Sequence, residues 1–504
     1  MGKIIDKFRL GMIKNFQNDR DYFFIIILAI CLFIRLPYFF IGMISPDEHG
    51  FFILGDLINQ GELPHENYFD NKPALVWYIY SIPSLLFKSV AFSRFFGFII
   101  IYSSCYFFYK LILNHYNSST AKISSIFFII TSSFVGTETA DQPIGPGLNI
   151  IVEHFCNFFL IMSIYFFLNK KRFYNYFCYI FLFLLIYLRI NYLVILPILI
   201  IYLNIKNKNL EILKLVFVGI LLFMIIHHSY FISYSRILDL KNFYFVLISY
   251  GTESSELFYA LKKYYNFLTL PLYSFNLINL RFYISLFIWI PSFLSIIFLF
   301  FSKEIKNEIN IIFLILFFLI LYSLTYGGAY EYYLIALTPF ISFFAAQIFS
   351  KFKKLNISII FILLLNVLIS TYSQHLWLIS RLKNNEEIYL GPDHKIAKFI
   401  YDNNLDVKKA FYFNYPIIYF HTNTKPLIKL IEPIKINYFF NKLSKEKDIN
   451  KVYQEIFDLN PSIVLYDRNQ WNIINSLAHN LIIDNLKNYK KIYESGFLEL
   501  YQKN

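Results

Sequence analysis

The chain has 504 residues, of which 57% are hydrophobic and only 16% are charged. Soluble domains carry roughly 25% charged residues, whereas this chain repeats apolar runs of about 18–22 residues, each able to cross roughly 30 Å of hydrocarbon as a helix. We therefore predict a polytopic membrane protein. The net charge is +13, but Lys and Arg cluster in short segments between the apolar runs, as in loops kept on the cytoplasmic side. This distribution argues against nucleic acid as a partner.

The N-terminal segment predicts a membrane anchor that begins inside the cell. Residues 1–21 carry several basic side chains, and an apolar run over 22–44 follows. The run is too long for a signal peptide, and no small-residue cleavage site follows it, so we expect a retained first span. Arg35 lies deep in this run, where it could pair with an acid of the helical bundle.

Two adjacent acids, Asp47 and Glu48, directly follow the first span. They could simply begin a helix, because Asp is a favourable N-cap and Glu suits the first turn. Acids at a membrane surface are also costly unless water, a cation or a substrate meets them, which makes both candidates for function. Residues 47–60 predict a short amphipathic helix that stops at Gly61. The side chains expected to lie on lipid are Phe51, Phe52, Leu54, Leu57 and Ile58.

Residues 73–88 are the main ambiguity in the topology. They are short for a span and contain Pro83, so we interpret them as a second helix along the outer surface. Lys72, just before this helix, could contact an anionic headgroup or be an interfacial lysine. With this choice the basic clusters fall inside, which gives about eleven spans with the N-terminus in and the C-terminus out. The spans are expected near 22–44, 93–113, 122–136, 147–168, 174–188, 190–205, 212–232, 282–301, 309–326, 333–350 and 356–372.

Further charged candidates lie on the same predicted outer face. Asp141 is in the second outer loop, and Glu153 and His154 are at the outer end of the next span. An acid within an apolar run costs roughly 2.5–3.5 kcal/mol on insertion scales, so we expect Glu153 to face a cavity. Either Asp141 or Glu153 could be the second acid of a site. Arg189, between two short apolar runs, could grip a phosphate with two hydrogen bonds or anchor the chain at the interface.

The rest of the chain adds an aromatic turn and a second domain. Glycines and aromatics at 326–333, including Tyr332 and Tyr333, suit a tight outer turn beside a sugar or prenyl chain. Composition changes abruptly after about residue 372, where short β-type runs at 410–413 and 462–466 alternate with helical stretches. We expect a transmembrane domain over 1–372, with a first outer loop at 45–92, and a small outer α/β domain over 373–504. The four cysteines, in or beside apolar runs, are expected to be buried thiols, and no metal-ligand spacing is visible.

Taken together, these elements resemble the GT-C membrane glycosyltransferases. The nearest branch is similar to bacterial relatives of the protein O-mannosyltransferases and the lipid A aminoarabinose transferase. Two positions depart from the common pattern: Ala74 stands where many relatives have a second proline, and Glu331 where His or Arg is frequent. The segments that carry the resemblance are 35–37, 46–48, 61–64, 72–75, 149–155, 327–339 and 411–419.

The resemblance implies a mainly α fold, a polytopic bundle with outer juxtamembrane helices and a small α/β domain. It also implies sugar transfer from a polyprenyl-phosphate donor to a cell-envelope acceptor, which could be a glycan, a lipid or a protein. The reaction would occur at the outer face of the plasma membrane, within reach of membrane lipid, and would invert the sugar. No cofactor is assigned, and a divalent cation between the acids is compatible with the reaction but not demanded by it.

The same resemblance suggests roles for individual side chains. Asp47 would be the general base, and Glu48 with Glu153 or Asp141 would orient the acceptor or the base. Lys72 and Arg189 would stabilise the leaving phosphate. The remaining expected substrate contacts are His154, Tyr332 and Tyr333.

Two other classes of function compete with this hypothesis. The first is a transporter or flippase of lipid-linked sugars, in which the charged groups would line a translocation path. The second is a polymerase or ligase of surface polysaccharide, which uses a lipid-diphosphate donor. Transporters often show paired halves, and no convincing internal repeat is visible here. The one-sided outer loops and the large outer domain favour the enzyme.

Overall fold

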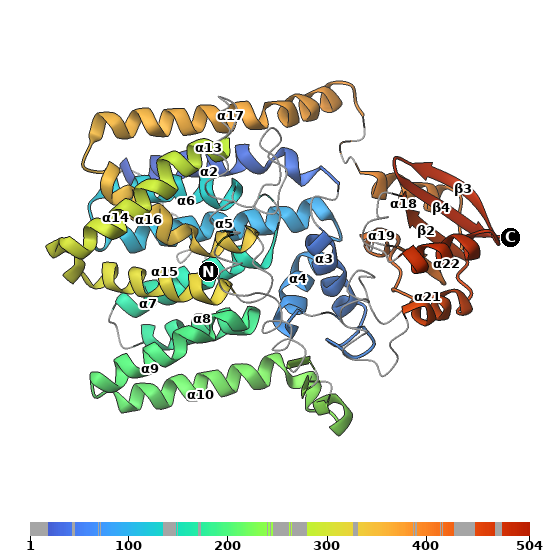
Figure 1. Ribbon diagram of the computed structural model, residues 1–504, viewed down its shortest axis with the longest axis horizontal. Coiled ribbons are helices and arrows are strands. Elements are labelled where there is room, and N and C mark those ends of the chain that lie inside the picture. The colour runs from blue at the N-terminus through green and yellow to red at the C-terminus, as the bar shows by residue number, and fades with distance from the viewer. Residues whose placement is uncertain are drawn as a thin grey trace, which may run out of the picture.

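The computed structural model shows a bundle of long apolar helices and a small α/β domain at one end of it (Figure 1). The predicted helical membrane bundle with a small α/β domain is confirmed. The residues that the structure describes are 19–42, 46–68, 70, 72–134, 148, 150–169, 173–238, 240–241, 243–244, 262, 264, 280–325, 331–386, 388, 391–413, 415, 417–427, 449–468 and 476–504.

A helix lies at each predicted span. Five of them, over 90–113, 209–226, 282–301, 332–349 and 356–383, are long and apolar enough to cross a membrane by themselves. The bundle helices are α2 (Asp19–Arg35), α5 (Val90–Leu113), α6 (Ser118–Phe134), α7 (Val152–Leu168), α8 (Tyr174–Leu188), α9 (Ile195–Ile205), α10 (Asn209–Ile226), α13 (Leu280–Ile284), α14 (Ile290–Phe301), α15 (Glu308–Leu324), α16 (Thr338–Phe349) and α17 (Lys353–Lys383). Short turns of other helix types are η1 (Pro37–Phe39), η3 (Ile190–Val194), η4 (His228–Tyr230), η5 (Ser285–Trp289), η6 (Lys303–Lys306) and η7 (Glu331–Leu337).

The first outer loop forms two helices, α3 (Pro46–Asn59) and α4 (Ala74–Leu86), which lie between the bundle and the C-terminal domain (Figure 1). They pack closely, because a Cβ placed on Gly55 of α3 would stand only 2.3 Å from the Tyr80 carbonyl of α4. Gly61, with a φ of +84°, follows α3 and is the predicted stop, since glycine adopts this left-handed conformation at little cost.

The expectation that the apolar face of α3 lies on lipid is wrong. Phe51, Phe52, Leu54 and Leu57 are all buried within the protein. The reason is that α4 covers one side of α3 and α19 of the C-terminal domain covers another. Local amphipathicity shows that a face is apolar but does not show what covers it.

The C-terminal domain is a four-stranded sheet with helices beside it. The strand order is β1-β2-β4-β3, with β1 parallel to β2 and the other pairs antiparallel. The strands predicted at 410–413 and 462–466 correspond to the parallel pair. The elements are α18 (Pro392–Asp402), β1 (Ala410–Tyr412), α19 (Ile417–Thr422), α21 (Ile449–Asp458), β2 (Ile463–Asp467), α22 (Ser476–Leu486), β3 (Tyr489–Ser495) and β4 (Leu498–Lys503). Residues 373–383, expected to belong to this domain, are the last part of α17.

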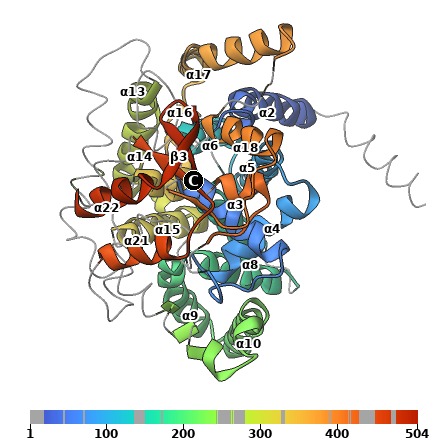
Figure 2. The same ribbon diagram turned by 90° about the vertical axis from the view of Figure 1, so that its right-hand side faces the viewer.

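Besides the packing of α19 on α3, polar and backbone contacts dock the C-terminal domain on the first outer loop. Lys88 bonds both Asp56 (2.6 Å) and Asn423 (2.7 Å), and Lys425 pairs with Glu62. Gly391 lies so close to Gly42 that a Cβ at Gly391 would stand 2.9 Å from the Gly42 Cα. The view from the side of this domain shows that α9 and α10 lie beyond its outline (Figure 2). The domain therefore covers the loop that carries the predicted acids and leaves other helices uncovered.

Candidate functional site

Asp47 is the centre of a group of polar side chains from three parts of the chain. It stands in the first turn of α3. One carboxylate oxygen lies 3.3 Å from the Lys72 ammonium, and the other accepts a hydrogen bond of 2.8 Å from the Tyr332 hydroxyl on η7. The Lys72 ammonium also lies 5.4 Å from the centre of the Phe51 ring. The Asp47 and Lys72 side chains are 25% and 20% exposed, so both can be reached from outside the protein.

A second group, beside the first, is built on Arg189. Its guanidinium pairs with Glu153 in the first turn of α7 and lies 4.1 Å from the centre of the Tyr333 ring. Tyr333 contacts Tyr332 edge to face, with their ring centres 4.8 Å apart, and Glu153 lies within electrostatic range of Asp47 and Lys72. The two groups therefore form one site, with two cations and two carboxylates arranged around a pair of tyrosines.

Glu48 has a quite different environment from its neighbour Asp47. It is fully buried and forms a two-fold ion pair with Arg94 of α5, with N–O distances of 2.6 and 3.0 Å. It also accepts a hydrogen bond of 3.3 Å from the Ile150 backbone N–H. A carboxylate enclosed in this way cannot reach an acceptor. Of the two roles expected for Glu48, only that of orienting the base is open to it.

Arg94 is a residue that the sequence pattern does not single out. Besides Glu48, its guanidinium donates to the backbone carbonyls of Tyr38 (2.7 Å), Ile41 and Gly42 (3.0 Å), so it ties α3 to the chain that leads into it. A signal was present, because an arginine inside an apolar helix needs a partner. Arg94 thus pairs with a buried acid of the bundle. Arg35, for which such a pairing was expected, donates to the Leu148 carbonyl at 2.9 Å and to Ser133 at 3.4 Å, and it lies within electrostatic range of Glu48.

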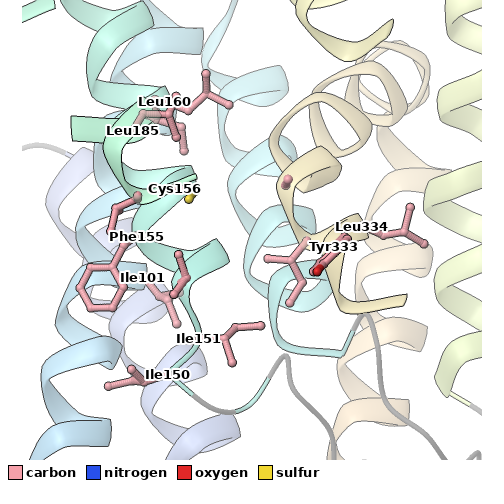
Figure 3. Close-up of a cluster of buried hydrophobic side chains, with 14 of the residues drawn as sticks. Ile101, Ile150, Ile151, Phe155, Cys156, Leu160, Leu185, Tyr333 and Leu334 are labelled. Atoms are coloured by element: carbon pink, nitrogen blue, oxygen red, sulfur yellow. The ribbon is translucent and has the colours of Figure 1, made fainter. Parts of the chain in front are cut away.

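Of the remaining predicted residues, the structure describes His154 and Tyr333 but not Asp141. His154 is buried in the first turn of α7, where its backbone N–H donates to the Ile151 carbonyl at 3.1 Å. Figure 3 shows Tyr333 and Leu334 in the apolar cluster to which Ile150, Ile151 and Phe155 also belong, so packed hydrocarbon underlies the site. Asp141 and the glycine turn at 327–328 lie outside the described residues.

The described side chains do not form a metal site. Within this part of the chain, no three His, Cys, Asp or Glu side chains are grouped so that they could hold a metal ion. Asp47, the most accessible acid of the site, instead faces an ammonium group, which would repel a cation.

No family model and no curated protein sequence matches this chain, but solved structures do. The oligosaccharyltransferase of Archaeoglobus fulgidus, tethered with an acceptor peptide containing the NVT sequon, superposes with a TM-score of 0.53 at 12% identity, over 97% of this chain and 74% of that chain. The apo form of that enzyme gives 0.51 at 13% identity, over 89% and 69%. Its complex with Zn and sulfate gives 0.51 at 14% identity, over 95% and 73%. The chain has the GT-C fold.

The GT-C fold expected from the sequence is thus confirmed over nearly the whole chain. The similarity in structure extends through both the bundle and the C-terminal domain, because up to 97% of this chain is covered. At 12–14% identity the similarity concerns the fold, and a fold can carry more than one function. The function must therefore be argued from the side chains of the site.

Proposed function

We propose that this chain is an integral-membrane glycosyltransferase that moves a sugar from a polyprenyl-phosphate donor to a cell-envelope acceptor, which is a glycan, a lipid or a protein. The observation that carries the proposal is the accessible Asp47 carboxylate held between Lys72 and Tyr332, with Arg189 beside them. A base next to two cations suits a displacement at a sugar carbon whose leaving group is a phosphate. The GT-C fold supports this class of reaction.

Asp47 is the general base in this proposal. The acceptor hydroxyl attacks the anomeric carbon, its proton passes to an Asp47 oxygen, and the bond between the anomeric carbon and the phosphate oxygen breaks. Because a single displacement occurs, the configuration at the anomeric carbon is inverted. The hydrogen bond from Tyr332 fixes one carboxylate oxygen, which leaves the other to receive the proton. Geometry of this kind is a large part of general-base catalysis.

Lys72 and Arg189 bind the leaving group. The donor phosphodiester carries one negative charge and departs as a polyprenyl monophosphate, which carries up to two, so negative charge grows on the phosphate oxygens in the transition state. Cations already in place stabilise that growth with little rearrangement. Arg189 is held between the Glu153 carboxylate and the Tyr333 ring, an arrangement that presents its remaining N–H groups in a fixed direction.

The contact between Lys72 and Asp47 links donor binding to activation of the base. In the resting site the ammonium stabilises the Asp47 carboxylate at 3.3 Å, which lowers its tendency to take a proton. When the donor phosphate enters, Lys72 turns toward it, and Asp47 becomes a stronger base. The acceptor is thus deprotonated only when a donor is present.

The proposed location is the plasma membrane, with the site and the C-terminal domain on the extracytoplasmic side. Two features support this orientation. The basic clusters at 206–214 and 351–354 lie at the opposite ends of the helices, as the cytoplasmic retention of positive loops predicts. A polyprenyl carrier also presents its sugar within the bilayer plane, where nucleotide sugars are absent.

The experiment that tests the function measures transfer of radiolabelled sugar from defined polyprenyl phosphates to membrane fractions. Wild type should transfer label, and Asp47→Asn should not. If Asp47→Asn transfers at the wild-type rate, the base is misassigned. A flippase would instead move labelled lipid-linked sugar across a vesicle membrane without changing it, and a polymerase or ligase would accept only lipid-diphosphate donors.

The structural comparison gives a reason to test the protein acceptor separately. The similar oligosaccharyltransferase was captured with an acceptor peptide, so we include transfer to protein and transfer of an oligosaccharide among the reactions to test. Supplying peptides with and without an Asn-X-Thr sequence, in parallel with glycan and lipid acceptors, separates these cases. Label found only on the Asn-X-Thr peptide would assign an oligosaccharyltransferase.

A further inference from the structure

Lys72 lies in the segment between α3 and α4, and its backbone is held on both sides by buried side chains. Its N–H donates a hydrogen bond of 3.0 Å to the Asp70 carboxylate, and its carbonyl lies 3.0 Å from Nε2 of the His65 ring. Asp70 and His65 are only 2% and 3% exposed. The base of the long, flexible lysine side chain is therefore fixed by two contacts made before its first rotatable bond.

The hydrogen bonds of His65 define its protonation state. A backbone carbonyl can only accept, so Nε2 carries the ring proton and donates it to the Lys72 carbonyl. The other ring nitrogen, Nδ1, then accepts from the buried Tyr230 hydroxyl of η4. Burial lowers the pKa of His65 to about 4. The ring thus stays neutral near pH 7, and its donor and acceptor sides keep their roles.

Packing from a distant part of the chain holds His65 in an unusual conformation. Its φ is +59°, a region that residues with a Cβ rarely adopt. Its ring stacks on Phe243 with centres 4.4 Å apart and meets Trp77 edge on at 5.2 Å. Arg236 lies over the Tyr230 ring at 4.8 Å and donates to the Pro64 carbonyl at 2.8 Å. The chain that follows α10 therefore holds the first outer loop in this arrangement.

We propose that His65 is a positioning residue for Lys72: through the Lys72 carbonyl, and under the control of Tyr230, it sets where the Lys72 ammonium stands relative to Asp47 and the donor phosphate. The ligand class affected is a lipid-borne phosphate, so this inference rests on the proposed function and deepens it. The donor phosphate already carries a negative charge when it binds, so a displaced ammonium weakens donor binding.

The test compares His65→Leu with His65→Gln in the full-length protein. Leucine fills a similar volume but offers no hydrogen bond, whereas the glutamine amide can still donate to the Lys72 carbonyl. We expect His65→Leu to raise the donor KM about tenfold while kcat changes less than about threefold, because ground-state phosphate binding is weakened. His65→Gln should recover most of the loss. His228→Leu, at an exposed histidine close to Tyr230, is the matched control and should behave as wild type.

A double-variant cycle shows whether His65 acts through Lys72. In the Lys72→Ala background, His65→Leu should reduce transfer by less than about twofold, because the group that it positions is already gone. Fully multiplicative losses would overturn the inference. So would a folded His65→Leu protein with a wild-type donor KM. If His65→Leu fails to fold, Tyr230→Phe provides the same test, since it removes only the hydroxyl that fixes the ring tautomer; it should raise the donor KM about threefold.

A binding measurement separates this inference from the proposed function. Decaprenyl phosphate is titrated into the purified protein in detergent, and the shift in melting temperature is recorded for the same variants. If wild type binds it, loses affinity in His65→Leu and regains it in His65→Gln, but transfers no sugar, the proposed function fails and the positioning role stands. If wild type transfers sugar and His65→Leu binds and transfers like wild type, only the positioning role fails. No binding and no transfer by wild type would remove both.

Discussion

Asp47 and Glu48 are consecutive acids in the first turn of one helix, yet they have opposite environments. Asp47 is a quarter exposed and contacts the Lys72 ammonium and the Tyr332 hydroxyl. Glu48 is fully buried and meets a two-fold guanidinium contact and a backbone N–H. The comparison shows that two neighbouring acids of α3 differ in what they can do: Asp47 is accessible, whereas Glu48 anchors the helix on α5.

The largest effect should come from Asp47→Asn. Asparagine keeps the size of the side chain and can still accept from Tyr332, but it cannot take a proton. Sugar transfer should fall by about 10²–10⁴-fold, the contribution typical of a general base. The melting temperature should stay within a few degrees of wild type. A parallel loss of folding would mean that Asp47, like Glu48, is structural.

Arg94→Met should show the opposite pattern and reduce stability first. Removing one partner of a buried ion pair leaves an uncompensated charge and costs about 3–5 kcal/mol. The free energy of unfolding, measured by denaturation in detergent, should fall by that amount. The control is the double variant Glu48→Leu/Arg94→Met, which removes both charges and should be more stable than Arg94→Met alone. If the single variant is as stable as wild type, the pair does not anchor α3.

Tyr332→Phe tests the environment of the accessible acid, Asp47, and should have a smaller effect than Asp47→Asn. It deletes one hydroxyl that donates to the Asp47 carboxylate, and hydrogen bonds to charged groups contribute about 1.5–3 kcal/mol. We expect kcat to fall about tenfold, with donor KM nearly unchanged, in steady-state transfer assays. Tyr322→Phe, at a half-exposed tyrosine of α15, provides a matched control that should retain wild-type kcat.

The smallest effect concerns His49, which follows Glu48 in the first turn of α3. It is fully buried, with both ring nitrogens lacking a hydrogen-bond partner among the described residues, near Asp393, Arg94 and His421. Burial lowers its pKa to about 3, against about 6.5 in the unfolded chain. The folded state disfavours the proton, so stability is complete above about pH 6.5 and falls as the pH drops toward 3.

The measurement for His49 is the melting temperature between pH 7.5 and 5. Wild type should lose stability with acid, and His49→Phe should show a shallower slope. Some slope should remain, because the pKa of His65 is also lowered by burial, to about 4. Identical slopes for the two proteins would show that His49 takes up its proton at the same pH in the folded and the unfolded state.

Much of the fold was accessible from the sequence because hydrocarbon thickness dictates helix length. The positions of the bundle helices, of the helix over 74–86 and of the strands at 410–412 and 463–467 all follow from apolar runs and their period. The burial of the apolar face of α3 could not be predicted from its own sequence, because the elements that cover it are separate segments of the chain, at 74–86 and 417–422. The residue pattern within a helix shows which face is apolar, but it does not show which elements pack against that face.

The site was only partly accessible for the same reason. Asp47 and Lys72 stand out because charges are rare beside membrane spans, and the structure does bring them together. Arg94 could be recognised in the sequence as an arginine in an apolar helix, but the residues next to it do not indicate that its partner is Glu48. His65 gave none: its role depends on a tyrosine 165 residues away and on a backbone conformation that residue type alone does not indicate.

The buried pair of Glu48 and Arg94 also bears on how the protein is made. The two residues are separated by only 46 positions, so both leave the ribosome early, before most of the bundle exists. Arg94 can thus be neutralised as α5 enters the membrane, when an isolated arginine would be costly. Tyr332, the partner of Asp47, is synthesised 285 residues after it. The anchor of the site can therefore assemble during insertion, whereas the contacts of the base are complete only when the chain is nearly finished, and a truncated product would be inserted but inactive.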